Sequence, residues 1–177
     1  MSAFTKEQLF EKLTWECESL RETILNMDER TFFSRVEPDK WSAAENVHHL
    51  QLAVRLLLLA FALPHWVLRV FGKPYGDGRS YEEVVASYQQ KLKAGAKASL
   101  PYVPSKKHAE SKQMMTEKML VSYGKLKAKL EPWPEEALDH YLLPHPILGR
   151  ITLREMIYFT CYHVQHHHMI IRNRYSL

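Results

Sequence analysis

Apolar residues recur at helical spacing along most of the chain, and capping signals divide this pattern into segments. In a capping box, a Ser or Thr and a Gln or Glu three positions later each bind an unpaired amide at the start of a helix. Thr5 with Gln8 is one example. Four such boxes predict helices over residues 5–27, 42–70, 80–94 and 152–174.

A fifth helix is predicted over residues 111–130 from the spacing of its apolar residues. Breaks rich in Pro and Gly separate the segments, at Pro38, 72–78, 101–104 and 132–149. Only short extended pieces around residues 141–148 resemble strands. The pattern therefore predicts an all-α protein, a four-helix bundle with an additional short helix, that forms one domain over residues 1–177.

The predicted second helix is apolar nearly all round between Leu50 and Leu63. Gln51 and Arg55 interrupt this run, and it is shorter than the roughly 20 residues that a membrane span requires. A bundle helix buries one stripe, so a second apolar stripe needs another cover. We expect a homodimer packed partly through this helix; in a monomer, the helix 80–94 would be the cover.

Composition and charge narrow the classes of function. The chain has 177 residues, 46% of them hydrophobic and only six Gly, which is typical of a globular helical protein and argues against disorder. Its net charge of +4 is modest and its basic residues are scattered, which argues against nucleic-acid binding. Two cysteines and no export signal at the N-terminus favour the cytoplasm.

Histidines are the candidate chemical groups, because ten occur in this short chain. At about 100° per residue, His163 and His167 lie on one stripe of the last helix, together with apolar residues that face the core. On the second helix, His49 shares a side with small and apolar residues. His48, His166 and His168 point elsewhere and are weaker candidates.

Two histidines at positions i and i+4 can direct their imidazoles to one point, and a third from a facing helix completes a face of three nitrogens. Such a site leaves a coordination position open for water or substrate. The alternative for each of the three histidines is that it is a core residue held by hydrogen bonds and not a metal ligand. Glu45, one turn before His49, is interpreted as a helix cap rather than a catalytic base. The remaining histidines are interpreted as surface or loop residues: His65, His108, His140 and His145.

Three stretches carry a resemblance to a known family. Residues 41–50 read Trp-Ser-Ala-Ala-Glu-Asn-Val-His-His-Leu, residues 145–152 begin His-Pro-Ile-Leu-Gly, and residues 158–171 contain the His-x-x-x-His pair. In this order they resemble the DinB-like superfamily of metal-binding four-helix bundles. The resemblance covers nearly the whole chain, and it implies that His49, His163 and His167 are the metal ligands, as the helical positions also indicate.

Members of that family with an assigned activity are thiol-dependent S-transferases and isomerases that use zinc or nickel, and others are labelled metal-dependent hydrolases. The resemblance thus implies an enzyme that activates a low-molecular-weight thiol or water toward a small-molecule substrate. Two alternatives stay open: a metal- or ligand-binding protein without turnover, and a stress-related interaction protein whose bundle serves assembly. Activity measured with and without a chelator would distinguish them.

Overall fold

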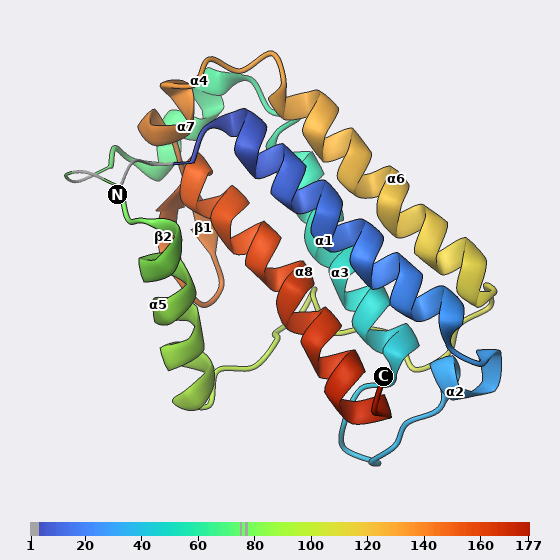
Figure 1. Ribbon diagram of the computed structural model, residues 1–177. Coiled ribbons are helices and arrows are strands. Elements are labelled where there is room, and N and C mark those ends of the chain that lie inside the picture. The colour runs from blue at the N-terminus through green and yellow to red at the C-terminus, as the bar shows by residue number, and fades with distance from the viewer. Residues whose placement is uncertain (1–3, 75, 77) are drawn as a thin grey trace.

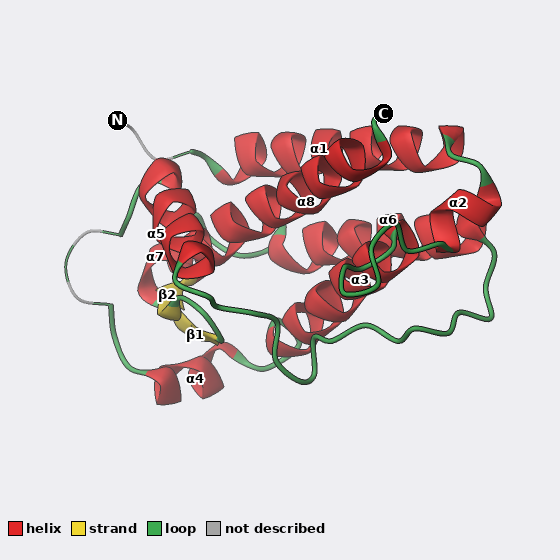
Figure 2. Ribbon diagram, turned by 90° about the horizontal axis from the view of Figure 1, so that it is seen from below, coloured by secondary structure: helices red, strands yellow, loops and turns green. Residues whose placement is uncertain are grey.

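A computed structural model describes residues 4–74, 76 and 78–177, apart from the side chain of His65. The longest helices of this part are α1 (Lys6–Asn26), α3 (Ala43–Ala60), α6 (Lys112–Leu130) and α8 (Leu153–Tyr175). They form a four-helix bundle in which a layer of α1 and α8 packs on a layer of α3 and α6 (Figure 2). Helices α1 and α8 run in one direction, and α3 and α6 run in the other (Figure 1). The predicted all-α bundle is confirmed.

All four predicted capping boxes are present, with both hydrogen bonds formed at each helix start. At α8, for example, the Thr152 hydroxyl accepts from the Glu155 amide at 3.1 Å, and the Glu155 carboxylate accepts from the Thr152 amide at 3.0 Å. The predicted fifth helix also forms, after Ser111 as its cap. These local signals fix where each long helix begins, and so which faces meet in the core.

The predicted extent of the second helix is wrong, because α3 ends at Ala60 rather than near Val70. A turn follows, and the chain resumes as the short helices α4 (His65–Leu68) and η1 (Arg69–Phe71). Pro64 explains the break: it lacks an amide hydrogen and disfavours a helical conformation in the residue before it. No helix in the described part of the chain is long and apolar enough to cross a membrane.

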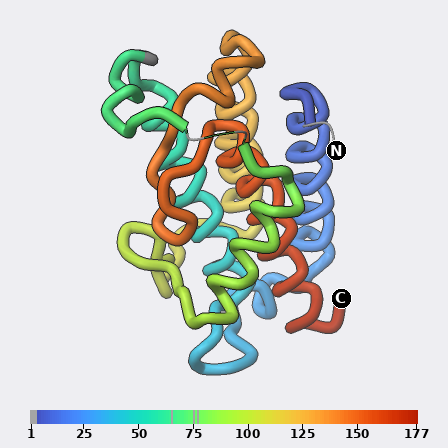
Figure 3. The backbone as a smooth tube through the Cα atoms, turned by 90° about the vertical axis from the view of Figure 1, so that its left-hand side faces the viewer, coloured from blue at the N-terminus to red at the C-terminus, as the bar shows by residue number. Residues whose placement is uncertain are grey.

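Helix α5 (Tyr81–Lys93) is the additional short helix, and it packs against α8 rather than against α3. The Tyr88 ring of α5 meets the Phe159 ring of α8 edge to face, with centroids 5.0 Å apart. A long loop, residues 94–111, leads from α5 back to the start of α6 (Figure 3). Two short helices that the sequence did not predict are α2 (Glu29–Phe33) and α7 (Ala137–His140).

The predicted extended pieces form an antiparallel hairpin of β1 (Leu142–His145) and β2 (Gly149–Thr152). Its second strand lies beyond the predicted range 141–148. Gly149 has φ of +77°, a conformation that side chains disfavour, and it pairs with His145 at the end of the hairpin. The hairpin leads directly into α8 and places residues 143–147 beside the site described next.

Candidate metal centre

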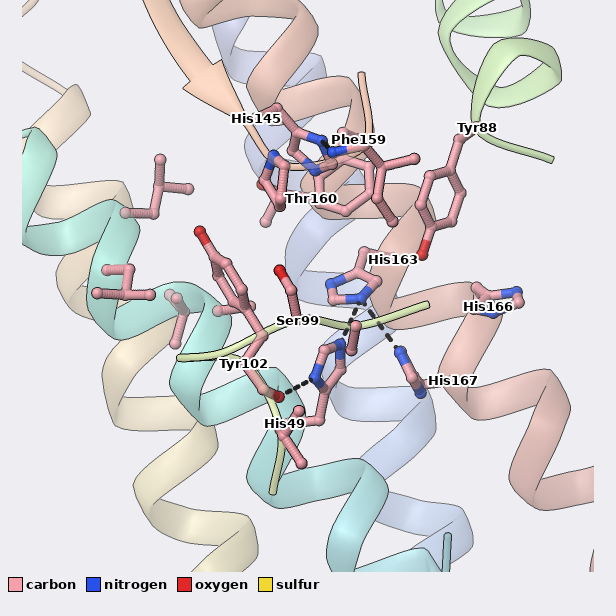
Figure 4. A pocket seen from close by; sticks show the side chains of 18 of the residues that line it. His49, Tyr88, Ser99, Tyr102, His145, Phe159, Thr160, His163, His166 and His167 are labelled. Atoms are coloured by element: carbon pink, nitrogen blue, oxygen red, sulfur yellow. Dashed lines mark hydrogen bonds between the residues drawn. The ribbon is translucent and has the colours of Figure 1, made fainter. Parts of the chain in front are cut away.

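The structure brings together the three histidines that were predicted as ligands. His49 of α3 and His163 and His167 of α8 are all buried, and one ligand atom from each lies within 4.8 Å of the others. The Nε2 atom of His163 is 3.0 Å from Nε2 of His49 and 3.1 Å from Nε2 of His167. Figure 4 shows the three rings directed at one point. The i, i+4 spacing in α8 and the facing position in α3 produce this convergence.

The outer nitrogens of two rings are bound to acceptors. Nδ1 of His49 lies 2.7 Å from the carbonyl oxygen of Tyr102, and Nδ1 of His167 lies 2.7 Å from Oδ1 of Asn46. A carbonyl oxygen can only accept, so Nδ1 of His49 must carry the proton. Nε2 of a neutral His49 is then a lone pair that faces the centre.

The ring proton of His167 can be placed in the same way once the orientation of the Asn46 amide is known. The Asn46 amide nitrogen lies 2.7 Å from the Ser42 carbonyl and 3.3 Å from the Trp41 carbonyl, both pure acceptors. It must therefore donate to them, which turns Oδ1 toward His167. His167 donates from Nδ1, and its Nε2 is a second lone pair aimed at the centre.

A bound cation satisfies the three converging nitrogens better than hydrogen bonds among the three rings do. His163, when neutral, has one ring proton and can donate from Nε2 to only one of the two acceptors. The other lone pair would stay buried without a partner, at a cost of about 1–3 kcal/mol. A divalent metal satisfies all three, and the Nδ1 hydrogen bonds of His49 and His167 are those that orient ligand imidazoles in metal sites.

Electrostatics keep these rings neutral. Burial lowers the pKa of His163 and His167 well below the ordinary imidazole value, and their histidine neighbours lower it further. Burial also lowers the pKa of His49, although the Tyr102 carbonyl opposes part of that shift. Neutral imidazole is the form that binds a metal, so none of the three rings has to lose an imidazolium proton near pH 7.

A cavity of about 850 Å³ opens from the three histidines. The hairpin, α3, α5, α8 and the loop 94–111 all contribute to its wall. Tyr88 and His145 line it from the side of α5 and the hairpin (Figure 4). The three histidines lie in the cavity wall, so a bound ion would be accessible to a ligand of the cavity.

A family model for the DinB superfamily matches residues 12–171, which is nearly the whole chain. The chain belongs to the DinB superfamily. Its fold is similar to that of YfiT from Bacillus subtilis, a protein described as a probable metal-dependent hydrolase with an unusual four-helix bundle topology. The two share 15% identity with a TM-score of 0.62, over 97% of this chain and 87% of YfiT. No curated protein matches the chain by sequence.

The neighbouring histidines of this DinB chain stay outside the cluster. His48 Nδ1 accepts from the Ser105 amide at 3.1 Å. His168 is half-buried and lies 2.7 Å from the Thr23 hydroxyl of α1. His166 is also half-buried and lines the cavity. The group of possible ligands found among the described residues does not include these three.

The interpretation of His145 as a surface or loop histidine is wrong, because it is buried in the cavity wall. Its Nδ1 accepts from the amides of Ile147 and Leu148 at 3.1 and 3.0 Å. This is the side-chain turn that the His-Pro-Ile-Leu-Gly sequence builds, and it leaves the ring proton on Nε2. Burial, and then the charge of Arg79, lowers the pKa of His145 to about 4.

Two of the other predicted surface histidines can also be placed. His140 is exposed, as expected, and His108 is half-buried against the rings of Phe33 and His48. The side chain of His65 lies outside the described part of the structure. Neither His108 nor His140 belongs to the cluster of three.

Glu45 is a helix cap, as predicted. Its carboxylate accepts from the Ser42 amide at 2.8 Å and binds the Arg35 guanidinium through both oxygens. Burial alone would raise the pKa of Glu45, but these hydrogen bonds hold it below its ordinary value. A carboxylate engaged in this way is a poor candidate for a catalytic base.

Both cysteines are remote from the centre. Cys17 and Cys161 are buried, and the Cys161 thiol lies 3.6 Å from the Leu9 carbonyl on the α1 side of α8. Burial raises the pKa of Cys161 to about 12. Neither thiol belongs to the group of possible ligands found among the described residues.

Proposed function

We propose that this protein is a metal-dependent enzyme in which His49, His163 and His167 hold one divalent ion, zinc or nickel. The observation that carries the proposal is the pair of Nδ1 hydrogen bonds to Tyr102 and Asn46, which leaves two Nε2 lone pairs facing a third imidazole. Imidazole nitrogens favour zinc and nickel over magnesium. Such an ion supplies Lewis-acid activation of a water or a thiol at its open position.

The protein's own groups bind and orient the substrate. His145 is held as the Nε2–H tautomer in the cavity wall, and it can donate a hydrogen bond to a substrate oxygen. Tyr88 offers a second donor: burial raises the pKa of its hydroxyl to about 12, so it stays protonated near pH 7. Two neutral donors beside a cation suit a substrate that gains negative charge on oxygen during reaction.

Hydrolysis and thiol transfer both fit this arrangement. The description of YfiT, a structural neighbour, supports hydrolysis. Membership of the superfamily supports a thiol-dependent transferase as the second form of the same proposal. In either form the substrate is a small molecule bound in the cavity.

The test is chelator-sensitive activity. Protein loaded with zinc or nickel is assayed against ester and amide substrates, and separately against small thiols paired with electrophiles. We expect turnover that a chelator abolishes and added metal restores. Turnover that survives removal of the metal, or none on either panel with the metal bound, contradicts the proposal and leaves a non-catalytic binding protein.

A spectrum separates the two forms. When a small thiol is added to the cobalt-loaded protein, a sulfur-to-metal charge-transfer band is expected only if the thiol enters the metal's open position. Cys17 and Cys161 are buried away from the centre, so a band present before thiol is added would contradict the all-histidine site. Metal binding without any thiol-induced band eliminates the transferase form.

A further inference from the structure

Two apolar stripes of α3 differ in how far they are buried. Val54 and Leu57 are buried in the bundle core, and both also border the cavity. Ala53, Leu56 and Ala60 lie on another stripe, are only half-buried and line the cavity. Part of the second apolar stripe of α3 therefore faces the cavity.

Small side chains create the space in this part of the cavity. Ala53 is one helical turn beyond His49, and Ala60 is two turns further along the same side of α3. Leu56 lies between them, and neither Ala53 nor Leu56 belongs to the packed core. The floor of the cavity therefore leads away from the metal centre as a continuous aliphatic surface.

The facing wall is apolar as well. Phe71 of η1, Leu143 and Ile147 of the hairpin and Met156 of α8 all line the cavity. Leu63, also a lining residue, is 41% exposed, so the apolar lining reaches the protein surface. We call this part, bounded by α3, η1, the hairpin and Met156, the apolar arm.

Apart from His145 of the hairpin, the polar donors named above gather at the other end. The three histidines and Tyr88 lie close together there: the Tyr88 ring centroid is 6.3 Å from that of His163. A cavity of about 850 Å³ is large for a small polar metabolite and falls within the range of sites that enclose drug-sized ligands. Water in an aliphatic arm lacks hydrogen-bond partners, so an apolar group displaces it favourably.

We propose that the apolar arm binds an alkyl or acyl chain, so that the substrate is an amphiphile whose chain lies along Ala53, Leu56 and Ala60. Its polar end then lies at the three histidines. The position of the reacting group rests on the proposed function, but binding of the chain does not. Each buried methylene contributes about 0.8 kcal/mol, so affinity should depend on chain length.

The test measures chain binding without metal. Chelator-treated protein is titrated with a dansyl-labelled undecanoate, which is then displaced by straight-chain alkanoates from butanoate to dodecanoate below their micelle concentrations. We expect the inhibition constant to fall by up to about fourfold per added methylene and then to level off when the arm is full. An inhibition constant that does not change with chain length overturns the proposal.

Matched variants locate the site. Ala60→Trp fills the arm and should weaken decanoate binding at least tenfold, and Ala60→Leu should shorten the chain at which affinity levels off. Ala62→Trp is the control, because Ala62 is exposed and does not line the cavity. Melting curves verify that each variant folds. Equal loss in Ala60→Trp and Ala62→Trp, or in neither, contradicts the assignment.

The outcomes keep the two proposals apart. Chain-length-dependent binding in a protein that fails to bind metal supports the apolar arm and refutes the proposed function. Normal metal binding, together with alkanoate binding that does not depend on chain length, supports the proposed function and refutes the apolar arm.

Discussion

The Nδ1 atom of His167 on α8 lies 2.7 Å from Oδ1 of Asn46 on α3, and both side chains are buried. Asn46 is fixed in turn by the carbonyl groups of Trp41 and Ser42 at the start of α3. The backbone at one helix start therefore determines which nitrogen of a histidine on another helix faces the centre. Metal affinity should depend on this residue, which is not itself a ligand.

Asn46→Leu should weaken metal binding about 10- to 100-fold, because the leucine removes the acceptor that holds the His167 proton on Nδ1. Zinc affinity is measured by competition with a chromophoric chelator. Gln51→Leu is the control: Gln51, also on α3, donates to the Met115 carbonyl at 2.6 Å and does not line the cavity. Equal zinc affinities in the wild type and Asn46→Leu would refute this role.

A second prediction concerns pH and His145. Its pKa is about 4 in the folded protein and about 6.5 when the side chain is exposed, so the unfolded chain binds the proton first as the pH falls. The stabilisation from neutral His145 is complete above pH 6.5 and is lost toward pH 4. The wild type should lose up to about 1.4 kcal/mol of unfolding free energy per pH unit through this residue.

His145→Asn isolates that contribution, because an Asn oxygen can accept the same two amides without titrating. Urea unfolding of metal-free protein is measured from pH 7.5 to 5 for both proteins. The free energy of unfolding should fall less steeply with acidification in the variant. Parallel slopes would show that His145 is not held as a buried neutral ring.

Assembly is the third prediction. Apolar residues remain exposed where α3, α4 and η1 meet: Leu59 is 59%, Trp66 71% and Val70 74% exposed. We expect a homodimer that covers this surface. Leu59→Glu with Trp66→Glu should shift sedimentation to the monomer, whereas Trp15→Glu, at a tryptophan on α1 that is 64% exposed, should not. A stable wild-type monomer at micromolar concentration contradicts the prediction.

The sequence predicted most of the helical frame because the capping boxes are local signals, and it singled out His49, His163 and His167 because their helical positions are periodic. The predicted end of the second helix near Val70 was wrong, because Pro64 interrupts the helix although the apolar pattern continues. The sequence missed Asn46, the Tyr102 carbonyl and the burial of His145, because their roles depend on contacts between distant segments. Those contacts become visible only when α3, the loop 94–111 and the hairpin are placed around α8.

The most direct test of the metal centre is the metal content of purified protein, measured for the wild type and five single variants. The wild type should hold about one zinc or nickel ion per chain. His49→Ala, His163→Ala and His167→Ala should lose it, whereas His48→Ala and His168→Ala should keep it. Equal occupancy in all six proteins, or loss in the last two alone, would contradict the three-histidine site.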